Sequence, residues 1–424
     1  MNNSISPDEI LSKANEALEA AHQAQFVTNN LWLLIATVLV FMMHLGFAAL
    51  ESGLVRRKNV VNILFKNVMI VSIGLLTYYL VGFNLMYPGT NTGGYFVLPS
   101  LGLSLPEGGL TSAYNNYTFW TDFIFQGMFA ATCCTIVSGA VAERMKLIPF
   151  LIFCLLFVSI SYPITGFWKW GAGWLETRGF YDFAGSTLVH SVGGWGALAG
   201  ILLLGPRAGK YTKTGIKPIP GHSMPLATLG VFLLWFGWFG FNGGSVLSAD
   251  PGLVSLVFVT TSIAAAAGAM GAFIVAYFRF RAFDLSMTLN GILGGLVGIT
   301  ASADSVTVGS ALLIGFVAGL LIPLSVHAFD KLKLDDPVGA TSVHLVCGIW
   351  GTLAVSLFGN FDDPTIGQLS DQLIGIAAVG AFTFGFAFLL FFILKITLGI
   401  RVTEVEEEKG LDLEEHGFEA YYLE

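Results

Sequence analysis

A series of long apolar stretches is the feature of this sequence that most restricts its fold. A helix needs about 20 mainly apolar residues to cross the hydrocarbon core of a bilayer, and eleven stretches of that kind follow one another along the chain. Charged residues make up only 11% of the chain, against about a quarter of a typical soluble domain. We therefore predict an all-α polytopic membrane protein, surrounded by lipid, with eleven transmembrane helices over residues 31–54, 63–84, 121–142, 147–167, 184–205, 224–246, 254–278, 285–303, 305–328, 339–358 and 372–398.

The distribution of basic residues predicts the orientation of these helices. Cytoplasmic loops of membrane proteins are enriched in lysine and arginine. When eleven helices alternate in direction, seventeen of the twenty lysines and arginines fall on one side of the membrane, and only Lys13, Lys169 and Arg178 fall on the other. The sequence therefore predicts an N-terminus outside the cell and a cytoplasmic C-terminus.

The segments outside the apolar stretches complete the predicted organisation. Residues 1–30 predict an extracellular amphipathic helix lying on the membrane, with Ser6 as its N-cap and Pro7 in its first turn. Residues 207–223 are predicted to form a cytoplasmic loop. Residues 399–424 form an acidic cytoplasmic tail, and residues 401–424 alone hold nine acids and two bases. This balance, without an RNA-binding fingerprint elsewhere, argues against nucleic acid as a partner.

An internal repeat relates the fifth and tenth apolar stretches. His190 follows Asp182 by eight residues, and His344 follows Asp336 by eight residues. The two repeats, residues 31–206 and 224–358, hold five helices each, so they must be inverted relative to one another, with 372–398 as an eleventh helix. Eight helical residues rise about 12 Å, and the hydrocarbon core is about 30 Å thick. The two histidines therefore descend from opposite faces to nearly the same depth, close enough to touch.

The histidine pair is the strongest candidate for function. An ionisable side chain inside a membrane is costly and marks a pathway or a proton relay by default, although a single buried histidine is more often structural. Two imidazoles without a third ligand make an incomplete metal site, so we expect no metal, no cofactor and no catalytic group. The cysteines lack zinc-site spacing and are predicted to serve in packing; they are Cys133, Cys134, Cys154 and Cys347.

Several longer motifs surround these histidines. They are Asp182-Phe-Ala-Gly-Ser-Thr-Leu-Val-His190, Gly237-Trp-Phe-Gly-Phe-Asn-Gly-Gly-Ser245, Gly139-Ala-Val-Ala-Glu-Arg144, Asp335-Asp-Pro, His344-Leu-Val-Cys-Gly-Ile and, in the tail, Gly410-Leu-Asp412, His416-Gly417 and Ala420-Tyr421. On these motifs the chain resembles the ammonium transporter family (Amt, Mep and Rh proteins) over essentially its whole length. The resemblance implies a homotrimer in the cell membrane, with a pore for ammonium or ammonia in each subunit.

The resemblance also implies roles for individual residues. Trp170, Ser245 and Phe129 would bind ammonium in an outer vestibule. From its position in the sequence we place Asp182 at the floor of this vestibule and at the start of the fifth helix, where its carboxylate can cap backbone N–H groups and favour nearby cations, and we expect this structural role more than direct ligation. A desolvated cation gains about 2 kcal/mol on an aromatic face, and a serine hydroxyl can accept an ammonium N–H. The stacked rings of the family correspond to Phe129 and Phe241, and further vestibule neighbours would be Phe125 and Trp238.

The apolar pore predicted around the histidines constrains the mechanism. A bare monovalent cation in such a medium costs tens of kcal/mol, so passage of the intact ion is disfavoured. We expect ammonium to lose its proton near the rings and ammonia to cross along His190 and His344. If the proton follows through the pair, transport carries charge. If it stays outside, the protein is a passive ammonia or carbon dioxide channel of the Rh type, and a third possibility is an ammonium sensor that signals through its tail.

The tail matches a family segment that helps to regulate transport, often with a PII signalling protein as partner. The residues that carry this match are Gly410, Asp412, His416, Gly417 and Tyr421. Considered without the resemblance, residues 402–409 are a charged helix in solvent.

The first apolar stretch departs from the family pattern because it contains His44 and Glu51. Glu51 is predicted near the cytoplasmic interface. We expect it to pair with Arg56 or Arg57, and a cation site at the inner mouth is the alternative.

Overall fold

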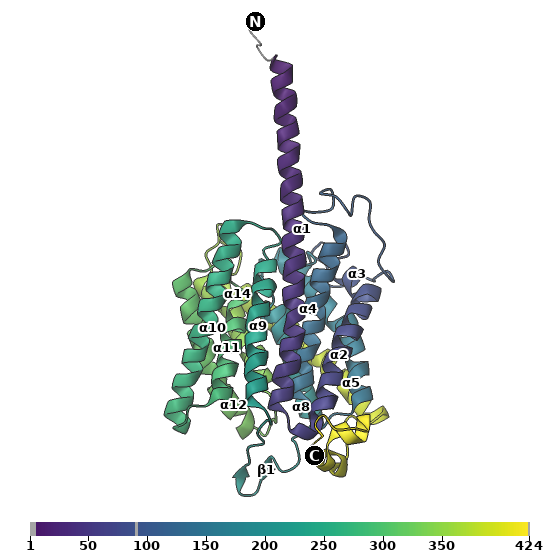
Figure 1. Cartoon of the computed structure of the whole chain (residues 1–424), viewed down its shortest axis with the longest axis vertical. Coiled ribbons are helices and arrows are strands. Elements are labelled where there is room, and N and C mark those ends of the chain that lie inside the picture. The colour runs from purple at the N-terminus through teal and green to yellow at the C-terminus, as the bar shows by residue number, and fades with distance from the viewer. Residues whose placement is uncertain (1–5, 90–91, 423–424) are drawn as a thin grey trace.

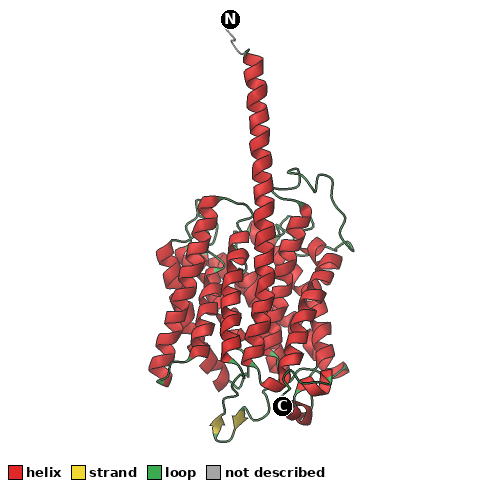
Figure 2. Cartoon of the chain, viewed as in Figure 1, coloured by secondary structure: helices red, strands yellow, loops and turns green. Residues whose placement is uncertain are grey.

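The chain folds into an upright bundle of helices, as a computed structural model that describes residues 6–89 and 92–422 shows (Figures 1 and 2). Its long helices are α1 (Pro7–Leu54), α2 (Val60–Thr77), α4 (Phe119–Ala140), α5 (Leu147–Leu156), α8 (Val192–Leu204), α9 (Met224–Gly244), α10 (Pro251–Phe280), α11 (Leu285–Ile299), α12 (Val308–Lys331), α13 (Cys347–Phe358) and α14 (Leu369–Thr397). Short helices are α3 (Phe83–Met86), α6 (Tyr162–Lys169), α7 (Trp174–Thr177) and α15 (Glu404–Lys409). A two-stranded hairpin, β1 (Tyr211–Thr212) and β2 (Gly215–Ile216), lies within the predicted loop at 207–223.

Single turns of π-helix or 3₁₀-helix extend several of these helices. They are η1 (Arg57–Asn59), η2 (Tyr78–Gly82), η3 (Phe157–Ser161), η4 (Ser186–Ser191), η5 (Thr341–Val346) and η6 (Asp412–His416). η1 is a 3₁₀ turn and the other five are π-helical turns. Turns of π-helix often occur at functional sites, and both histidines of the predicted pair lie on such turns.

Helices cover the apolar stretches that the sequence predicts. Within the described residues, ten helical segments are long and apolar enough to cross a membrane, and Leu285–Ile299 is a shorter apolar helix. The predicted stretch 121–142 corresponds to Phe119–Ala140, and the predicted stretch 339–358 corresponds to Thr341–Phe358. The observed bundle is therefore an all-helical, multi-pass membrane architecture.

The first helix differs from the prediction. Residues 7–54 form one helix of 48 residues, and its N-terminal half extends beyond the bundle as the purple rod in Figure 1. The prediction of a separate short helix within residues 1–30 is wrong. Residues 8–45 contain no glycine or proline, the two residues that most disfavour a helix interior, so the amphipathic segment continues into the first apolar stretch. Ser6 caps this helix by accepting a hydrogen bond from the Glu9 N–H at 3.2 Å. The first five residues of the segment lie outside the described residues.

Glycines allow α1 and α9 to pack closely along their length. A Cβ atom on Gly230 would lie 2.4 Å from the backbone nitrogen of Leu50, and one on Gly46 would lie 2.9 Å from Leu234. Small residues at such contacts let membrane helices approach each other closely. This contact brings the C-terminal part of α1 to the centre of the bundle, where the Phe47 ring lies 6.0 Å from that of His344.

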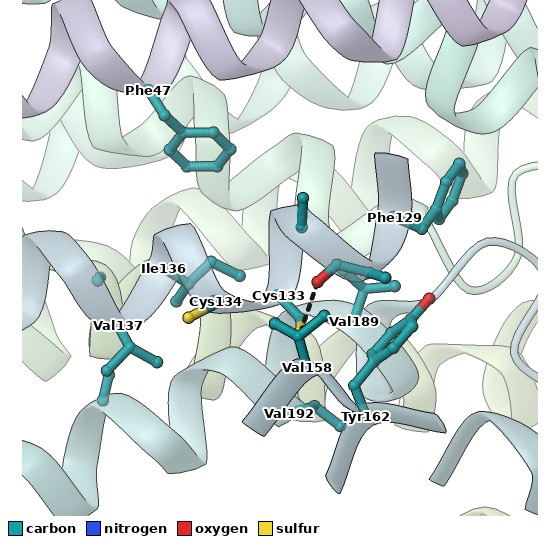
Figure 3. Packing of buried hydrophobic residues seen from close by; sticks show 14 of the residues in the cluster. Phe47, Phe129, Cys133, Cys134, Ile136, Val137, Val158, Tyr162, Val189 and Val192 are labelled. Carbon is teal, nitrogen blue, oxygen red and sulfur yellow. Dashed lines mark hydrogen bonds between the residues drawn. The ribbon is translucent and has the colours of Figure 1, made fainter. Parts of the chain in front are cut away.

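The centre of the bundle is filled by apolar side chains. Figure 3 shows Cys133 and Cys134 of α4 among neighbours such as Val137 and Val158, and both cysteines are fully buried and unpaired. The Cys133 thiol donates to the Ala130 carbonyl at 3.1 Å. These cysteines pack as small apolar residues do.

Candidate functional site

A cavity of about 490 Å³ opens at one end of the bundle, and we call it the Trp170 cavity. Trp170, Ser245, Phe125 and Phe129 all line it, so the structure brings these four predicted residues together. The Trp170 indole N–H donates to the backbone carbonyl of Asp182 at 2.9 Å, which orients the ring. The Ser245 hydroxyl donates to the Phe241 carbonyl at 2.8 Å, so its lone pairs remain available to accept a hydrogen bond.

Polar residues that the sequence analysis did not single out also line the Trp170 cavity. Asp122 is buried in the first turn of α4 and accepts a hydrogen bond from the Tyr114 hydroxyl at 2.8 Å. Lys169 and Glu176 line the same cavity and form an ion pair. Asp122 could have been found from the sequence, because it is an ionisable residue within the predicted stretch 121–142 and such residues are rare in membrane helices.

Two stacked phenyl rings close the bottom of the Trp170 cavity. The ring centroids of Phe129 and Phe241 are 4.0 Å apart with an angle of 23° between their planes. Phe125 contacts Phe129 edge-on at 4.9 Å. On its other side the Phe241 ring lies 5.3 Å from the His190 ring. The stacked pair therefore separates the cavity from the histidines.

His190 and His344 meet directly below these rings. Their Nδ1 atoms are 3.2 Å apart, and both residues are buried. A hydrogen bond between two neutral imidazoles requires one ring to donate and the other to accept. Within the described residues, no three His, Cys, Asp or Glu residues lie where they could hold a metal ion. The pair can therefore share a proton, and its surroundings do not complete a metal site.

Trp238 lies beside the histidines and not in the vestibule. Its ring stacks on His190 at 5.1 Å with an angle of 19°, and its indole N–H donates to the Thr300 hydroxyl at 2.9 Å. The prediction that Trp238 neighbours the vestibule is wrong, because α9 runs from Trp238 through Phe241 toward Ser245, which lines the Trp170 cavity. Trp238 therefore lies about two helical turns before the cavity, on the histidine side of the stacked phenyl rings.

Two aspartates build the turns that carry the histidines. The Asp182 carboxylate accepts four backbone N–H bonds, each of 2.9 Å, from Gly185, Ser186, Thr187 and Leu188. The Asp336 carboxylate accepts from the N–H groups of Gly339 at 2.9 Å and Thr341 at 2.7 Å. The N–H groups at a helix start need acceptors. Asp182 is fully buried and is not among the described residues that line the Trp170 cavity, and its four hydrogen bonds position η4.

Two further cavities continue beyond the histidines. A small one of about 20 Å³, the Glu51 cavity, is lined by both His344 and Glu51. A larger one of about 480 Å³, the Arg207 cavity, lies at the end of the bundle that carries the tail. Asn290 and Val338 line both of them. The Trp170 cavity, the stacked rings of Phe129 and Phe241, the histidine pair and these two cavities thus form one series through the bundle.

Glu51 does not pair with Arg56 or Arg57, and that prediction is wrong. Its Oε2 accepts from the Asn67 amide at 2.9 Å and from the Ser138 hydroxyl at 3.0 Å. Arg56 instead pairs with Glu143 at 2.8 Å. The reason is that α1 ends at Leu54, so Arg56 leaves the helix in another direction while Glu51 faces α2 and α4.

His44, the other departure from the family pattern, lies on α1 and is buried. Its Nε2 has no hydrogen-bond partner within the described residues.

A buried ionic network surrounds the Arg207 cavity. Arg207 contacts both carboxylate oxygens of Asp335, at 2.8 and 2.9 Å, and also contacts Glu143 at 3.0 Å. Burial alone would raise the pKa of both carboxyls, but the guanidinium of Arg207 holds the pKa of Asp335 and the pKa of Glu143 below their usual values. The network therefore depends on charged carboxylates.

The tail packs against this network. Glu407 is only 1% exposed, its carboxylate pairs with Arg401 at 2.8 Å, and it accepts the Ala208 N–H at 2.7 Å. The interpretation of 402–409 as a helix in solvent is wrong for Glu407, because the chain after α14 folds back and supplies both partners.

The motif residues of the tail lie on the bundle as well. Asp412 accepts the Asn62 N–H at 2.9 Å, and the His416 ring lies 5.1 Å from that of Phe65. The Tyr421 hydroxyl and the His222 Nε2 are 3.1 Å apart. Gly410 has a φ of 110° and Gly417 a φ of 77°, which are backbone conformations that favour glycine. The last two residues of the tail lie outside the described residues.

The bundle and this series of cavities are those of a multi-pass membrane transport protein. More specifically, the chain belongs to the Ammonium Transporter Family, whose model matches residues 31–421. It is 40% identical to the ammonium transporter Amt2 of Archaeoglobus fulgidus over 421 residues, which cover 92% of this chain and 87% of that protein. It is 36% identical to Amt2 of Haloferax mediterranei, over 93% of this chain and 90% of that protein.

Solved structures agree with this assignment. A structure described as "Sensor Amt Protein" matches with a TM-score of 0.85 and 38% identity, over 93% of this chain and 99% of that chain. Saccharomyces cerevisiae Mep2 matches with a TM-score of 0.79 and 30% identity, over 89% of this chain and 88% of that chain.

Proposed function

We propose that this chain takes up ammonium at the Trp170 cavity and conducts neutral ammonia past the histidine pair, while the proton crosses separately and transport carries charge. The observation that carries this proposal is the contact between His190 and His344 directly below the stacked rings of Phe129 and Phe241. A proton can move along such a contact, and a bare cation would find only apolar rings above it.

Recruitment of the cation rests on the residues that line the Trp170 cavity. Trp170, Phe125 and Phe129 present aromatic faces, and a desolvated cation gains about 2 kcal/mol on such a face. Ser245 offers a hydroxyl that accepts an ammonium N–H. The carboxylate of Asp122 adds negative charge to the cavity wall.

Deprotonation follows from the cost of the next step. Beyond the cavity the pathway narrows to Phe129, Phe241 and the two imidazoles, where an unpaired cation costs tens of kcal/mol. Ammonia is neutral and avoids this cost. Each neutral imidazole has one donor and one acceptor nitrogen, so the pair can pass a proton by exchanging tautomers.

The arrangement in the membrane is part of the proposal. We place the N-terminus outside the cell and the C-terminus in the cytoplasm, with inverted repeats over 31–206 and 224–358, an eleventh helix over 372–398, and a homotrimer with one pore per subunit. The similar construction of η4 on Asp182 and of η5 on Asp336 supports the repeat. The projecting end of α1 and the tail lie at opposite ends of the bundle (Figure 1), which supports opposite sides for the termini.

A current measurement tests this function. Purified protein in liposomes is given a pulse of ammonium, and the electrical current is recorded on a solid-supported membrane. We expect a saturable current that His190→Ala and His344→Ala abolish, while the exposed His22→Ala leaves it unchanged. A silent membrane with intact ammonia entry would establish a passive channel of the Rh type instead.

An ammonium sensor is the second candidate. A similar solved structure is described as a sensor. The tail of this chain packs on α2 through Asp412, and a cytoplasmic partner such as a PII protein would bind there in a way that depends on the position of the tail. Ammonium-dependent binding of a PII protein to liposomes that carry no ammonium current would favour this candidate over transport.

A further inference from the structure

Glu51 is a buried carboxylate that the proposed mechanism does not yet use. It is 2% exposed and lies in α1, one turn after Phe47. The Phe47 ring is 6.0 Å from the ring of His344, and all three residues line the Glu51 cavity. An ionisable group in this position is expensive in a membrane and calls for an explanation.

Two neighbouring helices hold one oxygen of this carboxylate in place. Oε2 accepts from Asn67 of α2 at 2.9 Å and from Ser138 of α4 at 3.0 Å. Asn67 is itself held by the Thr135 hydroxyl, which donates to its amide oxygen at 3.0 Å. Within the described residues Oε1 has no hydrogen-bond partner. The side chain is therefore oriented by three polar groups, and one of its oxygens stays available to a ligand of the cavity.

The cavity can hold the group that would connect Glu51 to the histidines. Its volume is about 20 Å³, and a buried water needs about 10–15 Å³ of such space. The Nδ1 of His344 is engaged with His190, so its Nε2 is the nitrogen that remains to exchange a proton with the cavity. Asn290 and Val338 then separate this cavity from the Arg207 cavity.

A buried cation completes the cluster. Lys66 of α2 is fully buried, its Nζ lies 3.5 Å from the Ser138 carbonyl, and it sits 5.1 Å from the ring of Phe150. Ser138 thus joins the two charged groups, because its hydroxyl donates to Glu51 and its carbonyl accepts from Lys66. A buried ion needs such compensation. Glu51 can therefore carry a negative charge here without direct contact with the Nζ of Lys66.

We propose that Glu51 receives the transported proton from His344 through water in the Glu51 cavity and returns it to ammonia as the ammonia leaves the pore. In the first transfer an imidazole N–H bond breaks and a carboxyl O–H bond forms. In the second transfer that O–H bond breaks, a fourth N–H bond forms on ammonia, and ammonium and the Glu51 carboxylate result. This inference rests on the proposed function and names the residue at which ammonium is formed again.

A glutamine variant tests the proposal with little change of shape. Glu51→Gln keeps an oxygen that accepts from Asn67 and Ser138 but cannot bind a proton at neutral pH. We expect its ammonium current in liposomes to fall about a hundredfold, the lower end of the contribution of a positioned acid or base. Entry of neutral ammonia, followed by alkalinisation of a dye inside the liposomes, should stay unchanged. Glu51→Asp should recover part of the ammonium current. The control Glu16→Gln, at an exposed position, should show the same current as the wild type.

Infrared difference spectroscopy provides a second test, because it detects protonation of the carboxyl group itself and not only the current. During ammonium transport the wild-type protein should show the carbonyl stretch of a protonated carboxyl group. In a folded Glu51→Gln variant this band should be missing.

The outcomes separate this inference from the proposed function. Full current in Glu51→Gln, or a wild-type protein without the carboxyl band, overturns the role of Glu51 while transport stands. Loss of both current and ammonia entry in folded Glu51→Gln also overturns it, because the residue would then only hold the pore open. A wild-type protein without any ammonium current overturns the charge-carrying function itself, and the role of Glu51 with it.

Discussion

The buried pair of Arg207 and Asp335 allows a quantitative test of the structure. The Asp335 carboxylate is fully buried and accepts three hydrogen bonds from Arg207, from the backbone N–H at 2.8 Å, from Nε at 2.8 Å and from a terminal nitrogen at 2.9 Å. Asp335→Asn keeps the shape of the side chain but removes its charge. Arg207 then remains buried with Glu143 as its nearest acidic partner.

The expected loss of stability follows from the burial of this pair. Removal of one partner from a buried pair typically costs about 3–5 kcal/mol, because it leaves a charge uncompensated. Since Glu143 still contacts Arg207 and an asparagine oxygen in the Oδ2 position still accepts two of the three hydrogen bonds, we expect the lower end, about 3 kcal/mol. The same change at Glu414, which pairs with Lys409 on the surface, should cost about 0–1 kcal/mol.

Unfolding in mixed detergent micelles measures both variants. The free energy of unfolding of Asp335→Asn and of Glu414→Gln is compared with that of the wild type under the same conditions. A loss below about 1 kcal/mol for Asp335→Asn, the range of an exposed pair, would refute the buried bidentate contact. Equal losses for the two variants would refute it as well.

Three further predictions follow from other contacts. Gly230→Val should strongly reduce the yield of folded protein in size-exclusion chromatography, because its Cβ would lie 2.4 Å from the Leu50 nitrogen. The control Gly385→Val, whose Cβ meets nothing within 4 Å, should elute as the wild type does. Equal yields of the two variants would contradict the close packing of α1 and α9. The free energy of unfolding should decrease as the pH drops below about 4, the usual range of carboxyl pKa values. The pKa values of Asp335 and Glu143 are depressed in the folded protein, so the unfolded chain binds more protons in this pH range. The free energy of unfolding of Asp335→Asn should depend less steeply on pH, and a slope equal to that of the wild type would contradict the prediction. Glu407→Ala should speed cleavage of the tail by added protease, since it removes the contacts with Arg401 and Ala208. The exposed Glu408→Ala should be cleaved at the wild-type rate. Equal rates for both variants would show that the packing of the tail on the bundle does not depend on Glu407.

The charged groups show why some contacts were beyond prediction. The arginines nearest to Glu51 along the chain are its expected partners, but its actual partners Asn67 and Ser138 come from α2 and α4. Likewise the charged sequence around Glu407 predicts a surface residue, but the chain after α14 folds back and buries it against Arg401 and Ala208. A partner of a polar side chain depends on which helices approach each other, and this approach is set by packing over the whole bundle.

The sequence by itself determined the helical, membrane-embedded class of this protein. The length and apolarity of each stretch are local properties, and they decide whether a segment can cross the hydrocarbon core as a helix. It also indicated His190 and His344, because an equal spacing from Asp182 and from Asp336 is visible without any contact. The tertiary structure decided that α1 continues beyond the bundle, that Trp238 lies on the histidine side of the stacked phenyl rings, and that Glu51 shares a cavity with His344. These three features depend on where each helix lies relative to its neighbours. Helix periodicity in the sequence does not specify that arrangement.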